Sequence, residues 1–212
     1  MRSLSLLHAG RLWPALAVFL MLAVSPLCAS TITLASTFGS GLSFDTVLSD
    51  NWFVVGGGNP QWIAASFQPS VAATLDSVDL GVNIFGTFIS VDLDTNAGGV
   101  PGSILESFAL TGNSRFPVLR TGTSTLHPLL TAGTTYWLVL TPGDSVGGWY
   151  FNNQGLNGAD YTHDNGTTWA TDTQLTPAFD INGTTTGVPE PSSALLFLTG
   201  LGGIGLYRRR RA

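Results

Sequence analysis

The amino-acid sequence predicts an all-β protein, an antiparallel two-sheet sandwich of jelly-roll-like type, between two terminal segments that lie outside its core. Short runs rich in β-branched and aromatic residues recur along the chain, with Gly, Pro, Asn and Asp between them. No long stretch between the terminal segments shows the 3.6-residue periodicity of an amphipathic helix. The part between the ends has roughly 160 residues, enough for one domain with a single core.

We expect nine strands in this region, at residues 52–55, 62–67, 77–84, 88–93, 104–109, 123–129, 135–140, 148–151 and 179–181. In the third of them, apolar residues from Val78 to Ile84 alternate with Asp79, Gly81 and Asn83. This pattern predicts a strand with one buried face and one wet face. The run 136–140 is apolar on both faces and is therefore expected to be a central strand.

The C-terminal end combines a rigid motif, an apolar stretch and a cationic stop. The motif is Val188-Pro189-Glu190-Pro191. Residues 192–207 carry no charge, and a helix of that length spans roughly 24 Å, a little less than the ~30 Å hydrocarbon core of a bilayer. We therefore expect a transmembrane helix here. The four arginines that follow favour the cytoplasmic side of the membrane; they are Arg208, Arg209, Arg210 and Arg211.

This tail resembles the PEP-CTERM sorting signal of Gram-negative bacteria in its motif, spacing and position. The resemblance implies recognition of Pro189-Glu190-Pro191 by an exosortase, a membrane enzyme of transpeptidase type, followed by cleavage and removal of the tail. It also implies a role in the envelope or in an exopolysaccharide-associated matrix such as a biofilm. Without the Pro-Glu-Pro motif, an ordinary C-terminal anchor or a buried core helix would explain the apolar stretch equally well.

The pattern of residues 1–29 is typical of a secretory signal peptide, which predicts export by the Sec machinery. Arg2 and Arg11 precede or flank an apolar run at 12–27, and small residues follow it. Cleavage is expected after Ala29, with Ser30 as the alternative. Lipidation of Cys28 is disfavoured because the bulky Leu27 stands directly before it.

These segments divide the chain into a signal peptide (1–29), a β-sandwich domain (30–183), a linker (184–187) and the sorting signal (188–212). The protein is expected to be exported, anchored in the inner membrane before processing, and then to reach the cell surface or the extracellular matrix. Residues 30–187 contain no lysine and two arginines against twelve acids, a net charge of −10. Such a domain repels nucleic acid, which we exclude as a partner.

The sandwich itself resembles the choice-of-anchor R class of exported bacterial β domains. The resemblance is carried by 96–102 with 104–107, by 131–140, by 148–150 and by 179–183. It implies a shared fold and a shared mode of anchoring. No catalytic residue is carried over from it.

The sequence suggests two candidate binding sites, one for carbohydrate and one for calcium. Trp149, Tyr150, Tyr161 and Trp169 occur among Asn and Asp residues, a mixture that sugar-binding sandwiches use; core packing is the alternative for these rings.

Asp92, Asp94 and Asn96 resemble the start of a calcium loop. The EF-hand interpretation fails because Ala97 and Ser103 occupy the positions that need Gly and Glu. A looser calcium site or a solvated turn remain as the alternatives, and no other cofactor is expected.

No catalytic residue is expected, and the chain is predicted not to be an enzyme. Ser145 stands in a G-x-S-x-G sequence, but that motif needs a strand-to-helix elbow and no helix is predicted after it. His127 and His163 are the histidines of the mature chain and show no ligand spacing. The chain is predicted to be a non-catalytic surface or matrix protein; a carbohydrate-binding module is the first alternative and a secreted hydrolase the second.

Overall fold

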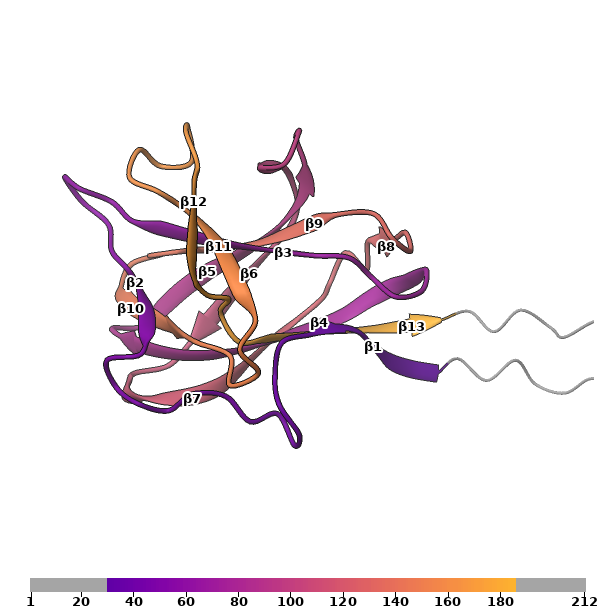
Figure 1. Ribbon diagram of the computed structural model, residues 1–212, viewed down its shortest axis with the longest axis horizontal. Coiled ribbons are helices and arrows are strands. Elements are labelled where there is room, and N and C mark those ends of the chain that lie inside the picture. Colours follow the sequence, from indigo (N-terminus) through magenta and orange to yellow (C-terminus); the bar gives the residue numbers. More distant parts are fainter. Residues whose placement is uncertain (1–29, 186–212) are drawn as a thin grey trace, which may run out of the picture. The chain divides into compact units, whose positions relative to one another are not determined.

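Thirteen strands, β1 to β13, make up the regular structure of residues 30–185, the part of the chain that the computed structural model describes (Figure 1). The strands form two antiparallel sheets, and none of these residues is helical. The predicted all-β class with two antiparallel sheets is confirmed. The predicted signal peptide and sorting helix lie outside the described residues. Within residues 30–185, no helix is present that is long and apolar enough to cross a bilayer.

The strands of the two sheets come from distant parts of the sequence. The seven-stranded sheet has the order β1-β13-β4-β10-β2, with β7 and β8 also paired to β4. Its strands are β1 (Ser30–Ser36), β13 (Phe179–Thr185), β4 (Ala73–Phe85), β10 (Val146–Tyr150), β2 (Asn51–Val54), β7 (Ser114–Thr123) and β8 (Leu129–Leu130). The six-stranded sheet has the order β12-β11-β3-β9-β5-β6. Its strands are β12 (Ala170–Leu175), β11 (Asn157–Thr162), β3 (Trp62–Phe67), β9 (Tyr136–Thr141), β5 (Phe88–Asn96) and β6 (Pro101–Thr111).

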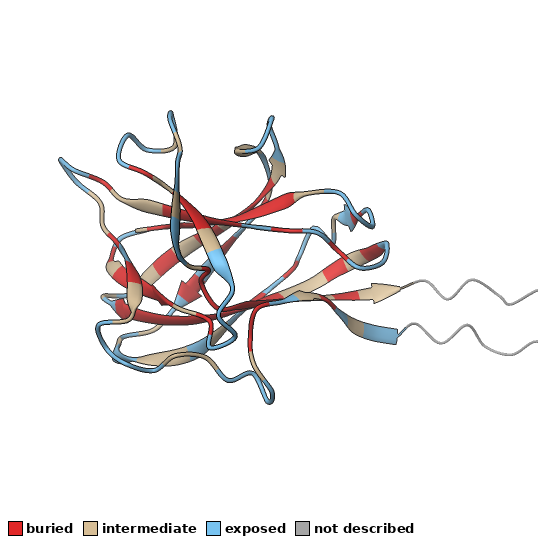
Figure 2. Ribbon diagram, viewed as in Figure 1, coloured by how far each residue is buried: buried red, intermediate tan, exposed pale blue. Residues whose placement is uncertain are grey.

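The main core lies between the inner faces of the two sheets. The alternating residues from Val78 to Ile84 on β4 point inward and are fully buried, as their pattern predicts. Ile63 and Leu138 meet them from the six-stranded sheet and belong to the same cluster. Figure 2 shows the buried segments running through the middle of both sheets, with exposed residues in the connecting loops.

The other face of β4 is covered, although its polar residues predicted a wet surface. Asp79 and Asn83 are both buried. The segment before β2 packs over this face, and the Phe44 ring lies so close to Gly81 that a Cβ there would meet it at 2.7 Å. Asn83 donates a hydrogen bond to the Tyr150 hydroxyl at 3.0 Å. The prediction of a wet face is wrong because distant parts of the chain, which the local pattern does not encode, cover it. Besides the loop over Gly81, side chains of β7 and β13 bind Asp79, which accepts hydrogen bonds from Thr121 and Asn182.

The strand predicted at 123–129 is also wrong. β7 ends at Thr123, β8 starts at Leu129, and the residues between them form a turn around the buried carboxylate of Glu106. His127 adopts a positive φ of 48° in this turn, a conformation that cannot continue a strand.

Four further strands, β1, β7, β11 and β12, were not predicted, and all four contain many small and polar residues. The linker predicted at 184–187 begins too early, because Thr184 and Thr185 complete β13. Ser30 pairs with Thr185, and Thr31 pairs with Thr184. The chain therefore enters and leaves the sandwich at the same end of one sheet.

Candidate functional site

The outer face of the six-stranded sheet carries a cavity of about 440 Å³. It crosses the sheet from β12 to β5, and its walls come from five strands, the turn that follows β5 and neighbouring loop residues. The lining residues are Ser66, Asn96, Gly99, Thr135, Trp137, Asn157, Gly158, Ala159, Asp160, Thr171 and Thr176. This size is typical of a site for a small molecule or for a segment of a polymer.

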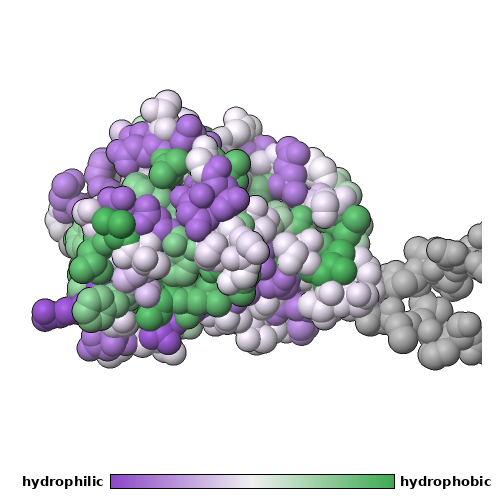
Figure 3. Space-filling model, turned by 60° about the horizontal axis from the view of Figure 1, so that its bottom comes forward, coloured by the Kyte–Doolittle hydropathy of each residue, from purple (hydrophilic) through white to green (hydrophobic). Residues whose placement is uncertain are grey.

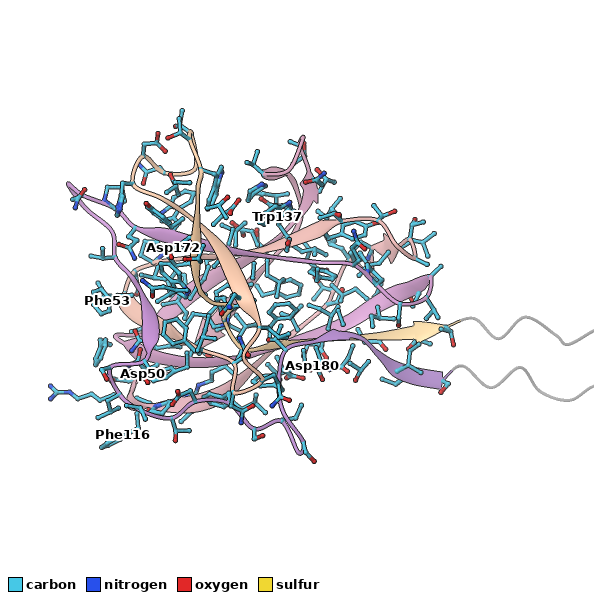
Figure 4. All side chains as sticks on the ribbon, in the orientation of Figure 1. Asp50, Phe53, Phe116, Trp137, Asp172 and Asp180 are labelled. Atoms are coloured by element: carbon cyan, nitrogen blue, oxygen red, sulfur yellow. The ribbon has the colours of Figure 1, made fainter. Side chains whose placement is uncertain are left out.

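The lining is polar and carries no positive charge within the described part of the chain. Hydroxyl groups and amides form most of it, Asp160 adds a carboxylate that is 5% exposed, and Trp137 adds an indole ring. Large apolar side chains are exposed elsewhere: Phe53 on β2 is 47% exposed and Phe116 on β7 is 67% exposed. Figure 3 shows apolar patches between polar residues on the lower side of the molecule, and Figure 4 places Phe116 at this side and Trp137 far from it. The cavity is therefore suited to hydrogen-bonding ligands and not to apolar ones.

Strand register brings the cavity residues together from distant parts of the chain. Ser66 on β3 pairs with Trp137 on β9, and Asp94 on β5 pairs with the other side of Trp137. Asp160 on β11 pairs with Thr171 on β12. Residues that are directly opposite in antiparallel strands project from the same face of the sheet, so these side chains share the outer face.

Hydrogen bonds hold the Trp137 ring in place. Its Nε1 donates to Oδ1 of Asn96 at 3.0 Å, and the same oxygen accepts the backbone N–H of Gly99 at 3.1 Å. One amide oxygen therefore ties the indole to the turn between β5 and β6. This arrangement fixes one wall of the cavity before any ligand arrives.

A second, smaller hydrophobic cluster supports this face. Ala64, Trp137 and Val139 are its buried residues, and the half-buried rings of Trp62 and Trp169 pack against them. The loop between β11 and β12 folds directly onto the cluster at Gly166, where a Cβ would lie 3.2 Å from the Trp62 ring. Both faces of β9 are thus buried, as the apolar run 136–140 predicts.

Two of the predicted sugar-stacking residues are core residues, so this part of the prediction is wrong. Trp149 and Tyr150 are 0% exposed. Trp149 packs against Phe179 in the main core, while Tyr150 is covered by Phe44 on the outer side of the other sheet. Neither ring has a free face for a ligand.

The other two predicted residues lie on opposite sides of the six-stranded sheet. Tyr161 points toward the main core and stacks on Trp52, with 6.2 Å between ring centroids. Trp169 lies on the outer face with Trp62 and Trp137. Trp62 and Trp137 were not among the predicted residues. The signal for Trp137 was present, because an apolar run on both faces of a central strand requires something to cover its outer side.

Asp92, Asp94 and Asn96 occupy alternate positions of β5 and not the loop that a calcium site was expected to use. The amide oxygen of Asn96 already accepts two hydrogen bonds, from Trp137 and Gly99. Residues 30–185 contain no group of three His, Cys, Asp or Glu side chains that could hold a metal ion. Calcium binding by these residues stays a prediction.

Asp94 lies in an unfavourable environment for a charge. It is 6% exposed, and its Oδ1 has no hydrogen-bond partner within the described residues. Burial, and secondly the nearby charge of Asp92, raise the pKa of Asp94 to about 7. Burial also raises the pKa of Asp92, although a hydrogen bond from Ser107 opposes this effect.

We expect the change in the free energy of unfolding caused by Asp94→Asn to be more stabilising at pH 8 than at pH 4.5. The raised pKa means that the folded wild type binds a proton that the unfolded chain does not, so its stability falls as the pH rises from about 4 to about 7. The variant lacks this loss, which we place at about 1–2 kcal/mol because relaxation of the surroundings lowers the cost of a buried charge. Urea unfolding at the two pH values measures the difference. The same effect of the substitution at both pH values would contradict the assignment.

The residues of a possible hydrolase are not brought together. Ser145 donates from Oγ to Oδ1 of Asp144 at 2.7 Å and accepts the backbone N–H of Thr87 at 2.9 Å. The Nδ1 atom of His127 lies 2.9 Å from the carbonyl oxygen of Leu75. His163 similarly lies 3.1 Å from the carbonyl of Pro60.

The hydrogen bonds around Ser145 stabilise a turn. Asp144 accepts hydrogen bonds from the hydroxyl groups of Thr87 and Ser145. Both lower the pKa of its carboxyl group, and the bond from Thr87 has the larger effect. Its Oδ1 also accepts the backbone N–H of Phe88 at 3.1 Å. Gly143, Asp144 and Ser145 therefore form the turn between β9 and β10, and the motif continues into β10 and not into a helix.

Comparison with known proteins identifies one segment. Residues 187–211 match the family model described as the PEP-CTERM protein-sorting motif. This confirms the motif on which the sequence resemblance was based, and it implies that the protein is exported, targeted to an exosortase and anchored in the membrane by its C-terminal sorting region. The choice-of-anchor R resemblance receives no support from these comparisons and stays a prediction.

No curated protein matches the chain. A chain in the crystal structure of the Aeromonas sobria serine protease in complex with its chaperone ORF2 is similar at 10% identity and a TM-score of 0.35. The similarity covers 81% of this chain and 30% of that chain. A likeness at this level establishes neither a shared fold nor a shared activity.

Proposed function

We propose that this protein is a non-catalytic surface or matrix protein that an exosortase releases from the inner membrane and that associates with exopolysaccharide. The observation that carries this proposal is the sorting motif at 187–211, which begins directly after the last strand of the sandwich. In this scheme the Sec machinery exports the chain, the tail holds it in the inner membrane, and cleavage frees the folded domain for display.

The geometry of the domain ends supports removal of the tail without damage to the core. β13 is not an edge strand, because β1 and β4 pair with it on both sides. Its last residue, Thr185, still pairs with Ser30. A cut near the Pro-Glu-Pro motif therefore leaves every strand of the sandwich in place.

The chemistry of the displayed domain supports a passive role near polysaccharide. It has no lysine and a net charge of −10, so it repels anionic polymers and remains soluble. The separate hydrogen-bonding environments of Ser145, His127 and His163 favour the non-catalytic interpretation over the secreted hydrolase.

Replacing Pro189-Glu190-Pro191 with three alanines is expected to block maturation. Proline fixes φ and excludes helix, which keeps the motif extended, and Glu190 is the charged group that it offers to an enzyme. The variant should accumulate in the inner membrane with its tail intact. Intact-mass measurement of the membrane and extracellular fractions tests this. Ser192→Ala with Ser193→Ala is the matched control next to the motif and should mature normally; normal maturation of the triple variant would overturn the proposal.

A further inference from the structure

We infer that the cavity on the outer face of the six-stranded sheet is a binding groove for a segment of neutral polysaccharide that lies across the strands. This inference deepens the proposed function and rests on it only for the statement that the domain is displayed near polysaccharide. The site itself is argued from the residues that line it.

The lining selects for an uncharged ligand with many hydroxyl groups. Ser66, Thr135 and Thr171 offer hydroxyls that can donate and accept, and Asn157 adds an amide. The Thr176 hydroxyl already donates to the carbonyl oxygen of Gly158 at 2.8 Å. Asp160 is the charged residue of the lining, so an anionic ligand would meet repulsion with no cation to offset it. An apolar ligand would leave these polar groups without partners, which is unfavourable.

The position of Asp160 suits a sugar. Its carboxylate is held on β11 between Ala64 and Thr171, which are directly opposite it on the neighbouring strands. A buried carboxylate accepts strong hydrogen bonds from hydroxyl groups, and adjacent hydroxyls of a sugar ring can reach its two oxygens. Trp137 is only 6% exposed, so its ring, fixed through Asn96, closes the wall of the groove and leaves recognition of the sugar to the polar groups.

The direction of the groove indicates a chain and not a single sugar. The lining starts at Thr171 on β12, crosses β11, β3 and β9, and ends at Asn96, the last residue of β5, and at Gly99 in the turn after it. Four inter-strand spacings separate β12 from β5, a distance of about 19 Å. Several linked sugar rings are needed to cover that length. Because the walls belong to strands, the groove is largely formed in the absence of ligand.

Affinity electrophoresis of the Ser30–Thr185 sandwich, which forms a compact unit by itself, tests the inference. The probes are a panel of neutral glucans, mannans and xylans together with alginate and pectate as acidic polymers, each with and without calcium. We expect retardation by at least one neutral polymer, independent of calcium. Ser66→Tyr and Thr171→Tyr place a ring in the groove at exposed positions and should each weaken binding at least tenfold.

Two further variants separate loss of the site from loss of the fold. Thr123→Tyr introduces the same ring at an exposed position of β7 on the other sheet and should leave binding unchanged. Asp160→Asn keeps the size of the side chain and should weaken binding about tenfold, so it tests the site even if a tyrosine variant is unstable. Thermal unfolding followed by circular dichroism checks each variant.

Each result that would contradict the inference leads to a different conclusion. Unchanged binding by the Ser66 and Thr171 variants would place the site elsewhere, and binding of acidic polymers alone would contradict the charge argument. Failure of every polymer to retard the domain would overturn the groove. If the Pro-Glu-Pro variant is still blocked in maturation in that case, the sorting function stands without the groove; if it matures normally, the proposed function fails on its own test.

Discussion

Trp149→Ala is expected to lower the free energy of unfolding of the sandwich by about 4 kcal/mol, the loss typical of a buried tryptophan. The side chain is fully buried and packs against Phe179 with 6.3 Å between ring centroids. Its Nε1 donates to the carbonyl oxygen of Ala178 at 2.9 Å, and the substitution leaves this acceptor without its partner. Urea unfolding of the Ser30–Thr185 sandwich measures the change.

Trp169→Ala is the matched comparison, because Trp169 is half-buried on the outer face of the sheet. It should cost about 1 kcal/mol, since little of the core depends on it. A small effect at Trp149 together with a large effect at Trp169 would contradict the assignment of Trp149 to the main core and of Trp169 to the outer face.

Sequence alone could place the strand that contains Trp149 but could not determine which way its ring points. The orientation depends on β4 and β2, which pair with β10 from distant positions: Val82 and Trp52 lie opposite Trp149. Periodicity identified the inward face only where it was strong, as in the run from Val78 to Ile84 on β4. In β10, Gly147 and Gly148 interrupt the pattern, so both orientations of Trp149 were consistent with it.

The same limit applies to the candidate groove. The sequence showed that β9 is a central strand, and its two apolar faces imply that its outer side is covered. The pairings of Ser66 with Trp137 and of Asp160 with Thr171 depend on strand order and register. These properties are set by long-range packing, and no local motif in this chain marks them. The sorting motif could be read directly because its chemistry is local.

Glu106→Ala is expected to lower the free energy of unfolding by about 3 kcal/mol. Glu106 is buried, and its carboxylate accepts hydrogen bonds from Ser124 Oγ at 2.6 Å and from the backbone N–H groups of Thr125 at 2.6 Å and Leu126 at 3.0 Å. Hydrogen bonds to a charged group contribute more than neutral ones, and alanine leaves three buried or half-buried donors without an acceptor. The turn that joins β7 to β8 should loosen, which hydrogen exchange at Thr125 and Leu126 would detect.

The pH dependence of stability separates this role from simple packing. Burial alone would raise the pKa of Glu106, but the hydrogen bonds from Ser124, Thr125 and Leu126 outweigh it and lower the pKa below the ordinary value of 4.5. The contribution of the charge is therefore present above pH 4.5 and is lost as the pH falls through the lower pKa of the folded state. Glu106→Gln keeps the shape and one acceptor oxygen, so it should lose about half as much stability and should lack the acid-side decline of the wild type. If Glu106→Gln shows the same acid-side decline as the wild type, the charge of Glu106 does not hold this turn.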